Sequence, residues 1–128
     1  RVYSKWHSMI KKELKKMNLT HPQFVVLASL AYLSQNGNEV TQVMISKLSG
    51  IDVMTVSQIL NLLEKNDFVK RKEHSRDTRA KAVILNKKGE EVLQKAVPLV
   101  EQIDEIFFGK LDTDEEQFKH FLARLNEE

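Results

Sequence analysis

Residues 55 to 61 carry short polar side chains of the kind that form hydrogen bonds with the edges of bases. They are Thr55, Ser57, Gln58 and Asn61, and charged residues follow only at the far end of the stretch, with Glu64 and Lys65. Hydroxyl and carboxamide groups read the donors and acceptors of the DNA major groove, whereas a helix that is merely exposed to water usually carries Lys and Glu there. The stretch therefore indicates one face of a helix that reads nucleic acid.

The sequence lacks the residue patterns of catalytic and metal centres. It has four glycines and contains no phosphate-binding glycine loop, no zinc-type His/Glu motif and no nucleophile motif. Its four histidines are widely spaced, and no thiol or group of carboxylates accompanies them; they are His7, His21, His74 and His120. We therefore expect no enzymatic activity, no metal and no cofactor, and we interpret His21 as a surface residue.

Two short helices separated by a tight turn are predicted to position the polar face. Thr41 is a good N-cap for the first helix, residues 42–49, and Gly50 is suited to the left-handed conformation that ends it. Asp52 is placed to cap the second helix, residues 53–66. The opposite face of this second helix is an apolar stripe of Val56, Ile59, Leu60 and Leu63. This arrangement is typical of a helix-turn-helix.

A charged hairpin is predicted directly after the second helix. Residues 69–73 and 80–85 contain β-branched residues that favour strands, and the basic, polar residues 74–79 form the turn between them. The consecutive apolar residues 83–85 indicate a strand that is covered on both faces at its end. Residues 39–40 are expected to add a short edge strand. Together with the two helices, the hairpin predicts a winged helix-turn-helix.

This stretch resembles the MarR (multiple antibiotic resistance regulator) family of winged helix-turn-helix transcription regulators. The resemblance is clearest in Asp77-Thr78-Arg79 of the wing and in the Leu-x-x-x-Gly pattern from Leu85 to Gly89. It extends over almost the whole chain and implies a mainly α fold with a small β-hairpin wing, a homodimer and double-stranded DNA as a partner. The chain departs from the family at Gln58 and Asn61, where a basic residue is common, which affects the expected base preference and not the fold.

The residues expected to contact DNA are a helix cap, the exposed side of the second helix and basic residues of the hairpin. They are Thr41, Met54, Thr55, Ser57, Gln58, Asn61, Lys72, Arg76, Arg79 and Lys81. The helix is expected in the major groove and the wing arginines in the minor groove. Asp77 is expected to orient the wing by holding the Arg79 guanidinium or a nearby strand. The alternative is that Arg79 only pairs with Asp77 and stiffens the hairpin.

Composition and charge agree with a single DNA-binding domain over residues 1–128. The chain is 41% hydrophobic and has no cysteine, no apolar run as long as a membrane span and no signal-peptide pattern. Formal charge is unevenly distributed, at +4 over residues 1–40, +5 over residues 41–89 and −7 over residues 90–128. The basic charge thus includes the part of the chain that is proposed to contact DNA, residues 41–89. We expect a cytoplasmic protein without a membrane partner; the sequence begins with Arg1 and not with Met, which leaves its native N-terminus open.

Helices on both sides of the winged part, residues 20–89, are predicted to form a dimer. Residues 1–19 and 90–128 contain amphipathic helices with more apolar surface than one small domain needs. The last helix is expected to start at Asp112 or Thr113, with Thr113 and Glu116 as a capping box. The residues expected to bury themselves in the dimer are Tyr3, Trp6, Ile10, Val100, Ile103, Phe107, Phe118, Phe121, Leu122 and Leu125.

These observations predict a homodimeric, sequence-specific transcription regulator, acting as a repressor on a pseudo-palindromic operator. The family resemblance also implies release by a small aromatic effector, although no residue here singles out its pocket. The alternative is a winged-helix module that binds proteins and has no sequence-specific affinity for DNA. A charge of +5 over residues 41–89, with Arg76 and Arg79 at the tip, argues against that alternative.

Overall fold

The computed structural model describes residues 1–77 and 80–127, which form a mainly α-helical fold with a small antiparallel sheet. The predicted fold class is therefore confirmed. The elements in chain order are α1 (Val2–Lys15), α2 (His21–Ser34), β1 (Val40–Thr41), α3 (Gln42–Ser49), α4 (Val53–Lys65), β2 (Val69–Glu73), β3 (Lys81–Leu85), α5 (Lys87–Phe108), a 3-10 helix (Gly109–Asp114) and α6 (Glu115–Leu125).

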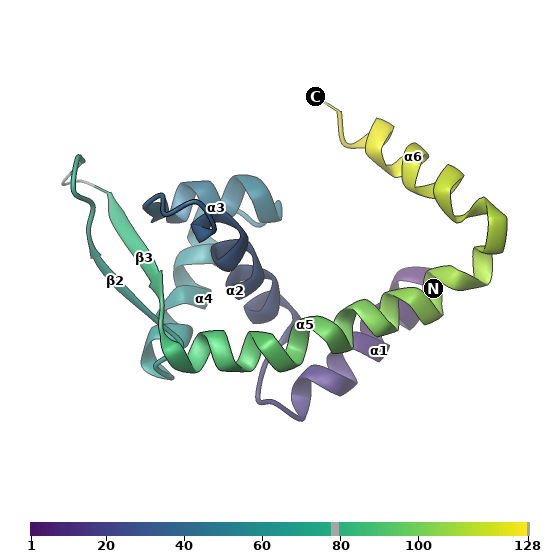
Figure 1. Ribbon diagram of the computed structural model, residues 1–128, viewed down its shortest axis with the longest axis horizontal. Coiled ribbons are helices and arrows are strands. Elements are labelled where there is room, and N and C mark those ends of the chain that lie inside the picture. Colours follow the sequence, from purple (N-terminus) through teal and green to yellow (C-terminus); the bar gives the residue numbers. More distant parts are fainter. Residues whose placement is uncertain (78–79, 128) are drawn as a thin grey trace.

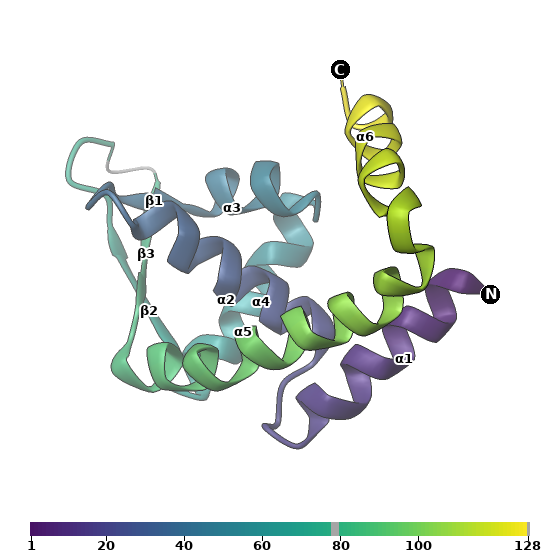
Figure 2. The same cartoon turned by 45° about the vertical axis from the view of Figure 1, so that its right-hand side comes forward.

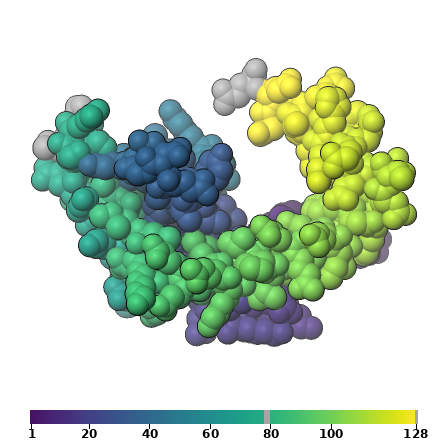
Figure 3. Space-filling view, viewed as in Figure 1, coloured from purple at the N-terminus to yellow at the C-terminus, as the bar shows by residue number. Residues whose placement is uncertain are grey.

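The long helix α5 connects a winged part at one end of the molecule with α6 at the other (Figure 1). Helix α1 lies alongside the second half of α5, and α2 crosses the winged part between α1 and α3, as the turned view also shows (Figure 2). In the space-filling view the molecule is concave between the winged part and α6 (Figure 3). The winged part and α6 therefore face each other across an open space.

Helix α2 is the centre of the core because it is apolar on nearly every side. Its residues Val26, Leu27 and Leu30 are completely buried, and α1, α3, α4 and α5 all pack against it. Thr20 and Gln23 form the capping box that starts it: the Thr20 hydroxyl accepts from Gln23 N at 3.2 Å, and Gln23 Oε1 accepts from Thr20 N at 3.1 Å. This support is what holds the helix-turn-helix in place.

The three strands are ordered β1-β3-β2, with both pairs antiparallel. In the register, Val40 is opposite Val83 and Arg71 is also opposite Val83, on the other side of β3. In β3, the central strand, Ala82 and Val83 are both buried although they point to opposite faces, whereas Ile84 and Leu85 are half-buried. The predicted edge strand is therefore confirmed, with β1 one residue later than predicted, and β3 is covered on both faces at its middle and not, as predicted, at its end.

The C-terminal region differs from the prediction. The backbone of Asp112 has a φ of 50°, and the chain forms a 3-10 helix before α6 begins at Glu115 without a side-chain cap. Thr113 and Glu116 therefore do not form the expected capping box. The apolar residues of α6 are exposed in the single chain, at 36% for Phe118, 47% for Phe121, 47% for Leu122 and 83% for Leu125. The reason is visible in Figure 1, where α6 stands away from the winged part.

Helix α5 begins at Lys87, three residues earlier than predicted, and continues through Pro98 as one helix. Among the described residues, no single helix is both long and apolar enough to cross a membrane; α3 and α4 meet that standard only if joined, and a bend of 113° separates them.

Candidate nucleic-acid interface

Helices α3 and α4 form the predicted helix-turn-helix, and local hydrogen bonds fix its turn. The Thr41 hydroxyl accepts from Met44 N at 3.3 Å, and Gly50 closes α3 with a φ of 77°. The Ser46 hydroxyl donates to the carbonyl oxygen of Ile51 at 2.6 Å. The bend of 113° between α3 and α4 is in the range of helix-turn-helix units. A short side chain at Ser46 thus lets its oxygen reach the turn where the helices meet.

The N-terminus of α4 is tied down by Asp52. One carboxylate oxygen accepts from Thr55 N at 2.9 Å and the other accepts from the Thr55 hydroxyl at 2.7 Å. These hydrogen bonds lower the pKa of the Asp52 carboxyl, so the cap stays ionised. The hydroxyl of Thr55 is consequently engaged inside the protein, and its predicted contact with DNA has to share that hydroxyl with the cap.

The outer face of α4 combines polar and apolar side chains. Gln58 and Asn61 are exposed and Ser57 is half-buried, as expected of a reading face. Met54 is 75% exposed and Leu62 is 52% exposed, which the polar pattern of this helix did not indicate for Leu62. The inner face, by contrast, buries Val56, Ile59, Leu60 and Leu63 as predicted. The outer face therefore offers amide groups next to apolar groups that fit thymine methyls.

Arg71 on β2 joins the wing to both helices, a role that its place in the sequence does not indicate. Its Nη1 donates to Gln42 Oε1 on α3 at 3.1 Å. Its Nη2 donates to Asn61 Oδ1 and, at 3.1 Å, to Glu64 Oε1 on α4. Its backbone N–H donates to Glu64 Oε2, also at 3.1 Å. The side-chain hydrogen bond from Arg71 lowers the pKa of the Glu64 carboxyl, so this charge-assisted pair persists at neutral pH.

The base of the wing tip is anchored through His74 and Glu39. His74 Nδ1 accepts from the backbone N–H groups of Arg76 at 3.1 Å and Asp77 at 3.2 Å. The proton of a neutral ring must then be on Nε2, which lies 3.4 Å from Glu39 Oε2. The same carboxylate oxygen accepts from Ser75 N at 3.0 Å. Hydrogen bonds from Ser75, first from its side chain and then from its backbone, lower the pKa of the Glu39 carboxyl.

The basic residues of the hairpin are exposed around this anchor. Lys72, Arg76 and Lys81 of the predicted set all lie at the surface. Asp77 donates its backbone N–H to His74, and its carbonyl oxygen accepts from Ala80 N at 3.0 Å. The predicted DNA contact of Arg79 lies outside the described residues, so it and the expected contact between Asp77 and Arg79 stay predictions.

The residues predicted for the dimer interface divide into a buried and an exposed group. Ile10 is completely buried and Ile103 is 7% exposed within the single chain, so both belong to the intrachain core. Trp6 is half-buried and donates from Nε1 to Asp104 Oδ1 at 2.8 Å. The more exposed residues among those predicted are Tyr3, Phe118, Phe121, Leu122 and Leu125, while Val100 and Phe107 are half-buried. Ile10 and Ile103 therefore have almost no surface left for a second chain, whereas the exposed and half-buried residues do.

His21 is not the surface residue expected from the sequence. It is half-buried, its Nδ1 lies 2.9 Å from His7 Nδ1, and its ring meets the edge of Trp6 with the ring centroids 5.4 Å apart. Burial is the main cause that lowers the pKa of His21, followed by the neighbouring His7, while Asp104 opposes the shift. Among the described residues, no group of three or more His, Cys, Asp or Glu is arranged to hold a metal ion.

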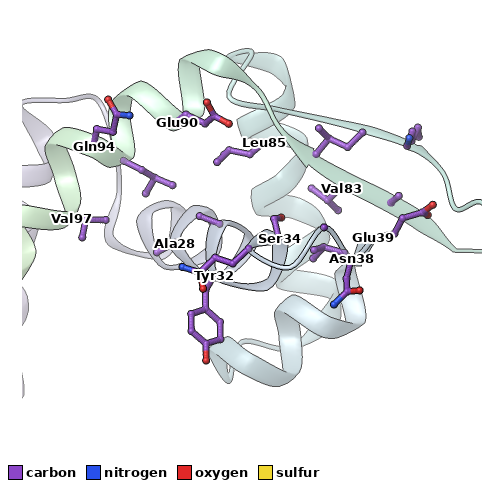
Figure 4. Close-up of a pocket in the computed structure, with 18 of the residues that line it drawn as sticks. Ala28, Tyr32, Ser34, Asn38, Glu39, Val83, Leu85, Glu90, Gln94 and Val97 are labelled. Carbon is purple, nitrogen blue, oxygen red and sulfur yellow. The ribbon is translucent and has the colours of Figure 1, made fainter.

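A cavity of about 1030 Å³ lies between the end of α2, the sheet and the first half of α5 (Figure 4). Its apolar lining includes Ala28, Val83, Leu85 and Val97. Three carboxylates line it, on Glu39, Glu90 and Glu101, and among the described lining residues the only cation is Lys72. The cavity therefore has an apolar floor and an excess of negative groups.

Comparison with known proteins gives consistent matches. The family model described as the ArnR1-like winged-helix domain matches residues 15–103. The chain is 35% identical over 122 residues to the uncharacterized HTH-type transcriptional regulator YdcH of Bacillus subtilis (strain 168), covering 95% of this chain and 80% of that protein.

Two solved structures show the same fold. A mutant of MarR from Escherichia coli, complexed with operator DNA, superposes with a TM-score of 0.87 at 22% identity, covering 98% of this chain and 89% of that chain. BpsR from Bordetella bronchiseptica, whose DNA binding is regulated by 6-hydroxynicotinic acid, superposes with a TM-score of 0.83 at 27% identity. The match covers 97% of this chain and 86% of that chain.

Proposed function

Because the chain belongs to the MarR family of winged helix-turn-helix transcription regulators, we propose that it represses transcription as a homodimer bound to a pseudo-palindromic operator. One observation carries this proposal: the exposed amides of α4 lie beside a basic wing whose base is anchored to the protein by Glu39 and His74. The proposed place of action is the cytoplasm, where such an operator would lie.

The proposed contacts follow from the exposed groups. Gln58, Asn61 and Met54 on α4 would face the major groove, whose donors, acceptors and thymine methyls they complement. Arg76 and the lysines of the hairpin would contact phosphates or enter the adjacent minor groove. The cap residue Thr41, at the start of α3, is placed to approach the DNA backbone, because helix N-termini attract phosphate.

The proposed dimer uses the two ends of the chain outside the winged part. Tyr3 on α1 is 64% exposed and Ile106 on α5 is 57% exposed, and Phe121, Leu122 and Leu125 of α6 are exposed as well. Exposed apolar side chains concentrated on terminal helices are typical of a subunit interface. Such a dimer would set the distance between two copies of α4, which must match the spacing of the operator half-sites.

The proposed effector occupies the cavity beside α2, β3 and α5. Figure 4 shows Leu85 and Val97 directed toward the interior of this space, while Tyr32 points away from it. An apolar floor suits a small aromatic ring. The three carboxylates favour a neutral or positively charged aromatic compound over an aromatic acid, because only Lys72 among the described lining residues would balance an added negative charge. A ligand bound there would contact both the sheet and α5. It would thereby change the position of the wing relative to the dimerisation helices.

Selection of bound fragments from random DNA, followed by anisotropy titrations and sedimentation, tests this proposal. We expect two chains per duplex and an affinity for the selected duplex at least about 10³-fold above that for scrambled DNA. Removing residues 109–128 should give a monomer and a large loss of affinity. Equal affinity for selected and scrambled duplexes would favour the protein-binding module instead, and a monomer at micromolar concentration would exclude the proposed interface.

A further inference from the structure

The guanidinium of Arg71 holds two carboxamides on the side of the protein that we propose faces DNA. It donates to Gln42 Oε1 on α3 and to Asn61 Oδ1 on α4. A guanidinium carries only donors, so an amide can meet it only through its oxygen. The nitrogen of each amide must therefore point away from Arg71. A free amide group, by contrast, can turn over and offer either atom.

We infer that Arg71 is a positioning residue that makes Gln42 and Asn61 donors toward DNA, an assignment that rests on the proposed function. Asn61 is exposed on the outer face of α4, so its Nδ2 group is directed at a base-edge acceptor such as guanine O6, purine N7 or thymine O4. Cytosine, which offers only its N4 donor in the major groove, is disfavoured at the same position. Gln42 is half-buried at the start of α3, next to the cap Thr41, so its Nε2 group is directed at a phosphate.

Arg71 has a second effect on the same surface through Glu64. The carboxylate of Glu64 lies on α4 one turn after Asn61 and is held by both the side chain and the backbone of Arg71. An unpaired carboxylate at this place would repel the phosphates of a bound duplex. The ion pair therefore keeps the approach to Asn61 free of negative charge. Loss of Arg71 would release the amides and expose this charge in one step.

The first test uses the protein without DNA and measures the guanidinium signals of Arg71 in ¹⁵N NMR spectra. Slow exchange of its Nη protons is expected, and Asn61→Ala and Gln42→Ala should each shift these signals. Lys70→Met, which removes a charge from the neighbouring exposed residue of β2, should leave them unchanged. An Arg71 signal that exchanges as fast as that of the exposed Arg76 would overturn the assignment.

The second test measures affinity for duplexes that carry each of the four bases at every position of a selected operator. Wild type should disfavour cytosine at one position of each half-site by roughly 5- to 150-fold. Arg71→Met and Asn61→Asp should both lose this preference, the second because it keeps an oxygen toward Arg71 but has no donor. Lys70→Met should weaken all duplexes by the same factor.

The double variant Arg71→Met/Glu64→Gln separates the two effects. It should regain the part of the affinity that Arg71→Met loses equally for all duplexes, because the exposed carboxylate is gone. It should not regain the base preference. If Arg71→Met keeps the wild-type pattern of preference, the positioning role is wrong while the proposed function stands. If wild type itself does not distinguish operator from scrambled DNA, the proposed function fails, and the NMR result alone decides whether Arg71 orients the amides.

Discussion

Gly89 lies so close to the carbonyl oxygen of Phe68 that a Cβ atom at Gly89 would stand 2.4 Å from that oxygen and 2.7 Å from Leu85 Cδ1. Gly89 ends the Leu-x-x-x-Gly pattern and lies in the first turn of α5, where the same Phe68 oxygen accepts from Asn86 N at 2.9 Å. A methyl group would have to push backbone aside. We expect Gly89→Ala to lower the free energy of unfolding by about 1–3 kcal/mol in urea denaturation.

Gly109 provides the matched control for that substitution. It has a helical backbone, with a φ of −60°, and no neighbouring atom of the described residues lies within 4 Å of the position of an added Cβ atom. Gly109→Ala should therefore leave stability unchanged or raise it by about 0.5–1 kcal/mol, since alanine loses less backbone entropy. Equal losses for the two variants would show that the contact with Phe68 is not the cause.

The anchor between Glu39, Ser75 and His74 should weaken in acid. The pKa of Glu39 is lowered in the folded protein. Its contribution to stability is therefore fully present above the ordinary carboxyl pKa and is lost as pH falls through the folded-state pKa. We expect the protection of the Ser75 amide, measured against its intrinsic exchange rate at each pH, to fall once Glu39 is protonated. Glu39→Gln should show this reduced protection already at neutral pH, with Glu73→Gln as the control. Protection of Ser75 that is the same in Glu39→Gln and wild type would contradict the anchor.

The contact between His7 and His21 should make the docking of α1 sensitive to pH. Because burial lowers the folded-state pKa of His21, the unfolded chain binds a proton at this residue more readily than the folded chain. The contribution of neutral His21 to stability is therefore fully present above pH 6.5 and decreases as pH falls below that value. The fluorescence of Trp6, the one tryptophan of the chain, should report this change, since its ring meets that of His21. His21→Phe should largely remove the pH dependence and His120→Phe should not. An unaltered pH profile in His21→Phe would contradict this explanation.

Local rules were sufficient to locate the helix-turn-helix. Thr41, Gly50 and Asp52 each act within a few residues of the helix end that they cap, so their identities alone indicate where α3 and α4 begin and end. The apolar periodicity of α4 is equally local, which is why its buried face was predicted residue by residue. These signals do not depend on the rest of the fold.

Contacts between distant residues could not be predicted in the same way. Arg71 meets Gln42 across 29 positions, and nothing in the hairpin sequence distinguishes it from the neighbouring Lys70 and Lys72. At α6 the spacing of Thr113 and Glu116 has the form of a capping box, but the left-handed backbone of Asp112 delays the helix. Which apolar residues contact a second chain stays a prediction, because their burial depends on that chain.

The last prediction distinguishes the wing from α4, because replacing Arg76 and replacing Gln58 should change DNA binding in different ways. Arg76 is an exposed charge near the wing tip, and Gln58 is an exposed amide on α4. Arg76→Ala should weaken binding to all sequences and reduce the slope of log affinity against log salt by about one unit per subunit. Gln58→Ala should leave that slope unchanged and cost roughly 1–3 kcal/mol at particular base positions.

Titrations over a salt series, with the selected duplex and its single-base variants, measure both effects. Lys12→Ala is the control, because this lysine lies on α1, outside the winged part, and should change neither the slope nor the base preference. A wild-type slope in Arg76→Ala would mean that the wing does not neutralise phosphate. A loss in Gln58→Ala that is equal for every duplex would mean that Gln58 supports binding without reading a base, and the assignment of α4 to the major groove would then rest on Asn61 alone.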